Sequence, residues 1–358
     1  MPTEPAADPH AEMIVIRPDR LTDYTQRIFA AAGAPKDVAR RVATSLVDSN
    51  LAGHDSHGVI RITQYLREIR EGQLDPKATP EIVREGPAWA LVDARWGFGH
   101  EAARFSMATA IDLARKSGVA AVSTVRCNHI GRLGEWGEQA AAAGLIGMAC
   151  VSFGHAGSLW VTPHGGAGRA LSTDPLTIGA PRPGNRALLA DFATSASPEG
   201  KVRVARDKGV PLPAGVLVDK AGYPSTDPND LYAGGALLPA AAHKGYVLGF
   251  MVELLSMAVS GAFEPEMMSE KGVSSGSFYL AIDPAAFGPV ERYARGVETL
   301  AQRMKSIQPA PGFQEVLLPG EPEHRTRESR AAGVSLPPAT WQAIAQDARS
   351  VGVEVPSV

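Results

Sequence analysis

The sequence has very little cysteine: Cys127 and Cys150 are the only two in 358 residues. Two thiols are too few for a disulfide framework and are typical of a reducing compartment, so we expect a cytoplasmic protein. Long apolar runs are also missing, whereas a membrane-spanning helix needs about twenty apolar residues. Residues 1–12 lack the basic start and apolar core of a signal peptide, and we expect a disordered tail there.

Charge of one sign is equally scarce. The net charge is −3 and no basic block occurs, which argues against nucleic acid as a partner. The hydrophobic fraction is 44% and charged residues make up 20%, values typical of an ordinary globular protein. A chain of 358 residues exceeds the usual size of one hydrophobic core, so two domains are expected.

Hydrophobic periodicity divides the chain into a helical first part and a mixed remainder. Helices are expected at 19–32, 36–51 and 59–71, an amphipathic helix at 101–116, a buried core helix at 246–262 and a last helix at 339–350. Short apolar runs typical of strands lie at 90–92, 119–125, 145–153, 187–192, 215–218 and 278–282. Residues 154–184 and 208–235 are dense in proline and glycine and predict long irregular connections, which usually carry function.

The most informative segment is Gly53-His54-Asp55-Ser56-His57-Gly58 and the residues that follow it. If a helix starts at Ser56, then His57, Arg61 and Tyr65 are four residues apart and share one helical face. A guanidinium grips a carboxylate through two parallel hydrogen bonds, and an imidazole moves a proton at neutral pH. The segment therefore predicts half of a site for a small carboxylic acid that is protonated or deprotonated on a neighbouring oxygen.

Simpler interpretations of the same residues remain open. Ser56 alone is more often a helix N-cap than a catalytic group. The three-residue spacing of His54 and His57 also suits a metal site, but no cysteine or carboxylate cluster completes a ligand set, and no metal is expected.

A second motif, Gly97-Phe98-Gly99-His100-Glu101-Ala102, matches the G-x-G-x-x-A dinucleotide fingerprint between a strand and a helix. Four residues, 93–96, separate the strand from the first glycine, whereas the fingerprint needs its turn directly at the strand end. No acidic residue ends the following strand either. A Rossmann site is therefore disfavoured here.

Three further positions complete the candidate chemistry. His129 follows the strand at 119–125 directly and is flanked by glycines that let a ligand approach, although such a histidine alone is more often structural. Asp191 ends another apolar run and suits the orientation of an imidazole or a cofactor amide, or simply a turn. Lys244 stands at the start of the apolar helix, where a lysine and free amides make an anion site, or is merely solvated.

Together these motifs resemble the type-2 malate/L-lactate dehydrogenases, the family that includes ureidoglycolate, sulfolactate and diketogulonate reductases. The resemblance covers roughly residues 15–355. It rests on the motifs Ser56-His57-Gly58 with Arg61 and Tyr65, His129-Ile130-Gly131, Asp191-Phe192-Ala193-Thr194-Ser195, His243-Lys244-Gly245-Tyr246 and Leu318-Pro319-Gly320-Glu321.

The resemblance implies an α/β, or α+β, fold that is not the Rossmann fold. It implies a helical domain formed by residues 13–88 together with 305–358, an α/β cofactor-binding domain with a mixed sheet at 89–304, and a homodimer. NAD or NADP would be the cofactor.

Roles follow from the resemblance position by position. His57 and His129 would be the proton carriers, Ser56 and Asp191 would polarise or orient them, and Arg61 with Tyr65 would hold the substrate carboxylate. Cofactor contacts would come from Asp191, Ala193, His243, Lys244, Gly245, Gly320 and Glu321. Glu135 stands where an aromatic residue is common, and Pro198-Glu199 interrupts a usual run of small residues, which puts the shape of the substrate pocket in question.

The predicted function is the reversible reduction of a 2-oxo acid to an L-2-hydroxy acid by NADH or NADPH. A related alternative is the reduction of a cyclic imino acid, with nitrogen in place of oxygen. A zinc hydrolase built on His54, His57 and His129, and a binding protein without activity, are the alternatives from other classes.

Overall fold

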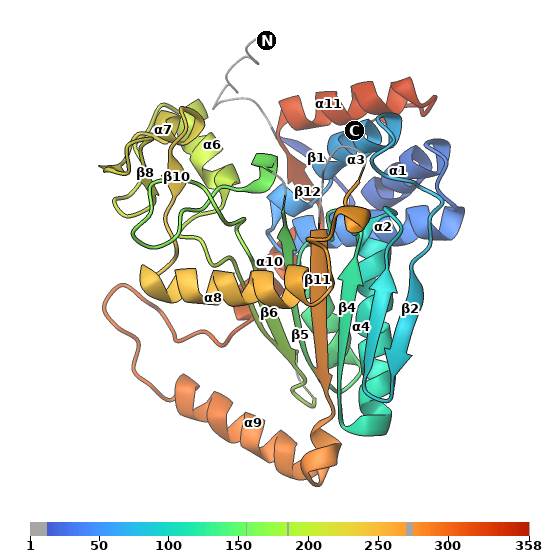
Figure 1. Cartoon of the computed structure of the whole chain (residues 1–358), viewed down its shortest axis with the longest axis vertical. Coiled ribbons are helices and arrows are strands. Elements are labelled where there is room, and N and C mark those ends of the chain that lie inside the picture. Colours follow the sequence, from blue (N-terminus) through green and yellow to red (C-terminus); the bar gives the residue numbers. More distant parts are fainter. Residues whose placement is uncertain (1–12, 155, 185, 270–274, 358) are drawn as a thin grey trace.

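The computed structural model describes residues 13–154, 156–184, 186–269 and 275–357 of the chain. The disordered tail expected at residues 1–12 lies outside these residues. A seven-stranded mixed sheet forms the centre of the molecule, helices lie on both of its faces, and a group of helices lies beyond one end of it (Figure 1). The α/β class expected from the sequence is confirmed.

The described residues form these helices: α1 (Pro18–Ala31), α2 (Lys36–Leu51), α3 (Arg61–Arg70), α4 (Gly99–Ser117), α5 (Gly134–Ala142), α6 (Glu199–Asp207), α7 (Pro228–Tyr232), α8 (His243–Glu253), α9 (Val290–Lys305), α10 (Glu321–Arg330) and α11 (Pro338–Ser350). The strands are β1 (Ile14–Ile16), β2 (Glu81–Gly86), β3 (Trp89–Asp93), β4 (Val119–Val125), β5 (Ile146–Phe153), β6 (Leu176–Ala180), β7 (Leu188–Phe192), β8 (Leu217–Val218), β9 (Pro224–Ser225), β10 (Ala236–Leu237), β11 (Ser275–Ile282) and β12 (Val334–Leu336).

The central sheet has the strand order β2-β3-β4-β11-β5-β6-β7. In its described residues only β3 and β4 run parallel, with α4 as their crossover, and every other neighbouring pair is antiparallel. A doubly wound nucleotide-binding sheet is mostly parallel. The mixed order therefore agrees with the expected non-Rossmann fold.

The two faces of the sheet carry different helices because successive side chains of a strand point to opposite sides. Ala149 and Val151 of β5 join the core beneath α4 and α5, whereas Cys150 between them packs with Val252 of α8. Figure 1 shows α8 lying across the strands in front of the sheet.

The two ends of the chain share one hydrophobic core. β1 pairs with β12, and residues of α1, α2 and α3 pack with Trp341 and Ile344 of α11. This core is separate from the one beneath the sheet. The domain limits expected at residues 88/89 and 304/305 remain a prediction.

Most expected elements occur close to their expected limits, but six strands were missed: β1, β2, β6, β9, β10 and β12. β2 has five exposed residues out of six, so no apolar alternation marks it. β6 lies inside the stretch 154–184 that was expected to be irregular, and its five residues are too short a signal among prolines and glycines.

The expectation of a fully buried helix at 246–262 was wrong. α8 buries Gly245, Gly249 and Val252, but Phe250 and Met251 on its outer side are 51% and 48% exposed. The helix continues as one π-helical turn at Leu254–Ala258. None of the helices in the described residues combines the length and apolar character that crossing a bilayer requires.

Candidate active site

The turn that carries His57 is fixed by Asn50 at the end of α2. The Asn50 side chain donates to Asp55 Oδ1 at 2.7 Å and accepts from the backbone N–H of Val59 at 2.9 Å. Gly58 has no room for a side chain, since a Cβ there would lie 2.1 Å from Asn50 Oδ1. One buried amide therefore sets the path of the chain on both sides of His57.

The condition of a helix that starts at Ser56 is not met, although the helix expected at 59–71 occurs as α3. Asp55–His57 is a 3-10 turn, Gly58 is extended, and α3 begins at Arg61. His57 therefore does not owe its place beside Arg61 to helical spacing.

His129 lies in the loop after β4, which Asn128 anchors. The Asn128 amide donates to the carbonyl oxygens of Trp96 at 2.8 Å and Gly97 at 3.1 Å. A Cβ at Gly99 would lie 2.2 Å from the carbonyl oxygen of Asn128. Gly99 thus allows the His129 loop to pack closely, whereas a Cβ at Gly97 would lie 2.8 Å from the carbonyl oxygen of Ala78. Close backbone packing therefore explains both glycines of the apparent dinucleotide fingerprint.

The two motifs meet at their histidines. The His57 and His129 rings are stacked, with centroids 5.4 Å apart and an interplanar angle of 23°. His57 Nδ1 lies 3.0 Å from the Ser56 hydroxyl, and His129 Nδ1 lies 2.7 Å from the Tyr65 hydroxyl. The fold therefore assembles Ser56, His57, Tyr65 and His129 into one cluster, as the sequence predicted.

Both imidazoles are held neutral. Burial, followed by repulsion from Arg61, lowers the pKa of His57 to about 3 and lowers the pKa of His129 well below its usual value. Neutral imidazoles are suited to exchanging a proton or a hydrogen bond with a substrate oxygen.

Arg61 lies at the edge of this cluster with part of its guanidinium free. Its Nε donates to the Ser56 carbonyl oxygen at 2.6 Å and its Nη1 to Gln64 at 2.6 Å. Its Nη2 has no hydrogen-bond partner among the described residues. The Arg61 guanidinium therefore retains donors for an anion beside the two histidines.

Asp191, on β7, bonds to the helix start next to the His129 loop rather than to an imidazole. Its Oδ2 accepts from the backbone N–H of Gly134, the first residue of α5, at 2.8 Å. Burial raises the pKa of Asp191, and the charges of His54 and Arg132 oppose that rise. Its predicted part in orienting a histidine finds no direct contact here.

The expected cofactor segments lie along the β7 strand. The Ala240 amide donates to the Thr194 carbonyl oxygen at 2.8 Å, which places the start of α8 beside Ala193. The Leu189 amide donates to the Pro319 carbonyl oxygen at 3.2 Å, which brings Gly320 to the same strand. Two segments that are far apart in sequence thus converge on β7 and the residues that directly follow it.

The start of α8 has the features of an anion site. Ala241 and Ala242 have φ of 50° and 57°, an unfavourable conformation for alanine that is typical of functional turns. His243 and Lys244 follow, both exposed, and no carboxylate of the described residues pairs with the Lys244 ammonium. Gly245 leaves no room for a side chain, since a Cβ there would lie 2.6 Å from the Thr194 carbonyl oxygen.

Glu321 differs from the other predicted cofactor residues because its carboxylate is already occupied. Its Oε2 accepts from Lys305 at 2.5 Å and from the Leu318 amide at 2.8 Å. Gly320 caps α10 with φ of +88°, a conformation that favours glycine.

The two departures from the family pattern fall in different places. Glu135 accepts a hydrogen bond from Ser45 of α2, which places it between α2 and α5, and its charge helps to raise the pKa of Tyr65. Glu199 is the first residue of α6. Burial and the charge of Arg203 lower the pKa of Arg61, and the charge of Glu199 opposes this lowering. Of the two, Glu199 is the one whose charge acts on Arg61 itself.

The geometry does not support the zinc alternative. His54 Nε2 is 3.9 Å from Glu323, and His57 Nδ1 faces Ser56. Among the described residues, no group of three or more histidine, cysteine or acidic side chains is arranged to hold a metal.

Sequence reasoning missed three contributors to the site. Asn50 gives no signal because only the fold brings its partners, the Asp55 carboxylate and the Val59 amide, to its side chain. Asn128 directly precedes His129, and of the three it is the one that its place in the sequence could have revealed. His100 is 2% exposed and packs edge-on against Tyr65, with centroids 5.6 Å apart.

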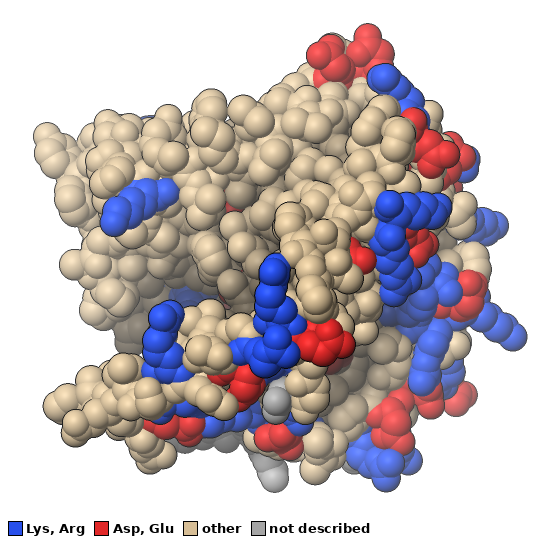
Figure 2. Space-filling view, turned by 90° about the horizontal axis from the view of Figure 1, so that it is seen from below, with Lys and Arg blue, Asp and Glu red and all other residues tan. Residues whose placement is uncertain are grey.

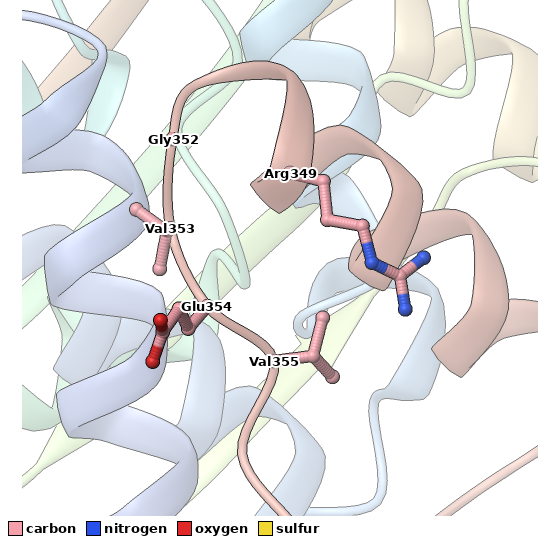
Figure 3. A pocket seen from close by; sticks show the side chains of 5 residues that line it. All are labelled: Arg349, Gly352, Val353, Glu354 and Val355. Carbon is pink, nitrogen blue, oxygen red and sulfur yellow. The ribbon is translucent and has the colours of Figure 1, made fainter.

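Surface hollows lie elsewhere. One of about 480 Å³ is lined by Arg349 and residues 352–355 at the C-terminal end, where Figure 3 shows the side chains of Arg349 and Glu354 pointing apart. They form no cluster that bears chemistry.

Residues 16–345 match the family model of the malate/L-lactate dehydrogenases. Hydroxycarboxylate dehydrogenase B of Escherichia coli (strain K12) is 38% identical over 93% of this chain and 93% of its own. The Delta(1)-pyrroline-2-carboxylate/Delta(1)-piperideine-2-carboxylate reductase of Pseudomonas syringae pv. tomato is 33% identical over 88% of this chain and 91% of its own. The solved structure of a putative malate/lactate dehydrogenase from E. coli superposes with a TM-score of 0.88, at 36% identity and 96% coverage of both chains.

With this fold and this site, the chain belongs to the malate/L-lactate dehydrogenase family. It is an oxidoreductase of the class that acts on the CH–OH group of 2-hydroxy acids. The family resemblance drawn from the motifs is confirmed.

Proposed function

We propose that the protein catalyses the reversible reduction of 2-oxo acids to L-2-hydroxy acids with NADH or NADPH. The observation that supports this most is the cluster of Arg61, His57 and His129. This cluster places the Arg61 guanidinium, which has free donors, next to two neutral imidazoles. The guanidinium would hold the substrate carboxylate, and the imidazoles would reach the oxygen on the adjacent carbon.

The residues along β7 fit a nicotinamide dinucleotide. The amides at the start of α8 and the Lys244 ammonium, which pairs with no carboxylate of the described residues, would hold its phosphates, while Ala193 and Gly320 would line its path and Asp191 would bond a polar group. When bound, the cofactor supplies or removes the hydride. The protein's part is to hold the carboxylate at Arg61 and to direct the imidazoles at the reacting oxygen.

The assembly and location that we propose are a cytoplasmic homodimer. Val247, Phe250, Met251 and Leu254 form an exposed apolar row along α8, which a second copy would cover. Figure 2 shows that, on the face seen from below, charged side chains gather on the right and along the lower edge, whereas the upper left carries few of them. Both cysteines are buried free thiols, as suits a reducing compartment. Light scattering that gives about twice the 37.6 kDa of one chain would support the dimer.

The decisive assay follows oxidation of NADH and of NADPH separately with a panel of 2-oxo acids. His57→Ala and His129→Ala should each reduce kcat by roughly 10²–10⁴, the range for a positioned proton carrier. If both variants keep more than about half of the wild-type kcat, the site lies elsewhere.

Reduction of a cyclic imino acid is the second candidate, because a reductase of that substrate class is among the relatives. The same guanidinium would hold its carboxylate. Including Δ1-piperideine-2-carboxylate in the panel compares the two candidates by kcat/KM.

A further inference from the structure

The hydroxyl of Tyr65 is directed at His129 and not at the open part of the site. Tyr65 is 1% exposed, and its hydroxyl lies 2.7 Å from His129 Nδ1. A side chain enclosed in this way has no surface to offer to a substrate carboxylate. The role that the family resemblance implies for Tyr65 is therefore at odds with its position.

A second contact decides where the proton of His129 lies. The backbone N–H of Gly131 donates to the same Nδ1 atom at 3.4 Å. An amide can only donate, so Nδ1 carries no proton, and the Tyr65 hydroxyl must donate to it as well. The proton of the neutral ring is then on Nε2.

The Gly131 amide cannot easily move away. Gly131 has φ of +75°, and a Cβ at this position would lie 2.5 Å from His100 Nε2. The buried His100 ring thus fills the space on that side and holds the loop against His129, with ring centroids 6.4 Å apart.

The partner of His57 is different in kind. His57 Nδ1 faces the Ser56 hydroxyl, which accepts as readily as it donates. His57 can therefore change its protonation state without losing its partner. Protonation of His129 at Nδ1 would instead set two N–H groups against each other.

We propose that Tyr65 is a positioning residue that, with the Gly131 amide, fixes His129 as the Nε2–H tautomer, so that His129 is the hydrogen-bond donor to the reacting oxygen and His57 is the proton carrier. In oxidation, the proton of the substrate hydroxyl passes to Nε2 of His57, while the Nδ1–H of His57 donates to the Ser56 hydroxyl. In reduction, the same proton returns to the oxygen. The assignment of these roles rests on the proposed function, whereas the tautomer does not.

The tautomer is read directly by long-range ¹H–¹⁵N correlation spectra of the full-length protein labelled with [¹⁵N]histidine. The His129 signals are those lost in His129→Gln. We expect Nε2 protonated and Nδ1 unprotonated across the neutral range in the wild type, and a mixture of tautomers in Tyr65→Phe. Nδ1–H or an imidazolium at His129 in the wild type would overturn the proposal, whether or not the protein reduces 2-oxo acids.

Kinetics give the second readout. Tyr65→Phe should lower kcat roughly tenfold, the effect of losing one hydrogen bond, with little change in substrate KM. A rise in KM at unchanged kcat would instead make Tyr65 a substrate ligand and would contradict the proposal. Tyr24→Phe is the matched control: its buried hydroxyl has no partner among the described residues, so neither readout should move. If no substrate is reduced while the tautomer is as expected, the proposed function fails and the tautomer assignment stands.

Discussion

Asp191 Oδ2 accepts a hydrogen bond from the backbone N–H of Gly134 at 2.8 Å, which ties β7 to the first turn of α5. A carboxylate at a helix start satisfies an otherwise unpaired amide and interacts favourably with the helix dipole. The bond also links the strand that gathers the proposed cofactor segments to the loop that carries His129.

Substitutions at Asp191 should separate its structural role from its cofactor role. Asp191→Ala should lower the free energy of unfolding by about 1 kcal/mol, as loss of a cap does. Asp191→Asn keeps an acceptor and should lower it much less. Urea denaturation measures the change in the free energy of unfolding, and titration with reduced cofactor measures the change in cofactor affinity. If both variants bind cofactor as well as the wild type, Asp191 is structural alone.

Arg61→Met should raise the substrate KM by roughly 30-fold or more, since a charge-assisted bond in a partly enclosed site is worth about 2–3 kcal/mol. Some loss of kcat should accompany it, because Arg61 also holds the Ser56 carbonyl oxygen. Cofactor affinity should stay near that of the wild type. Gln64→Ala, which removes a neighbour and keeps the guanidinium, is the control. Equal weakening of substrate and cofactor binding would argue against a carboxylate site at Arg61.

Lys244→Ala should weaken cofactor binding by roughly tenfold or more, as expected for a bond to a charged group of about 1.5–3 kcal/mol. Lys116→Ala, an exposed lysine at the far end of α4, should have no effect. Gly99→Ala is not a suitable control, because its Cβ would collide with the backbone of the His129 loop. Fluorescence titration of NADH and NADPH gives both affinities. Unchanged binding in Lys244→Ala would move the phosphates away from the start of α8.

Asp174 predicts a pH dependence of stability. It is fully buried, the hydroxyls of Ser152 and Ser172 donate to its Oδ1, and burial raises its pKa from 3.8 to about 7. A raised carboxyl pKa means that its stabilising contribution is full below the unfolded pKa and is lost as pH rises through the folded pKa.

The free energy of unfolding of the wild type, relative to that of Asp174→Asn, should therefore fall by on the order of a few kcal/mol between about pH 4 and about pH 7. Above that pH the difference should level off. Asparagine keeps the Oδ1 acceptor and tolerates the φ of 37°. Urea unfolding at a series of pH values tests this. Glu253→Gln is a second variant to be measured in the same way, because Glu253 accepts a hydrogen bond from the same Ser152 hydroxyl at 3.2 Å. A difference that grows with pH would contradict the prediction.

Local chemistry in the sequence determined much of the molecule. The apolar periods of α1 and α2 and the glycine breaks after them placed those helices within about a residue. The histidine and arginine motifs predicted the carboxylate chemistry, because the types of side chain and their order along the chain limit what they can do together. Likewise, the gap between the strand and Gly97 counted against the dinucleotide fingerprint, and three residues, 94–96, still separate β3 from that glycine in the structure.

Only the tertiary structure decided how those groups meet. The stacking of His57 on His129 depends on the contact between Asn50 and Gly58, which shapes the His57 turn, and on Asn128, which ties the His129 loop to the distant Trp96. The role of Tyr65 changed for the same reason, because α3 turns its hydroxyl to the His129 ring and encloses it. The outer face of α8 was expected to be buried because its side chains are apolar. The sequence shows that a side chain is apolar, but it does not show whether the surface that buries it belongs to the same chain.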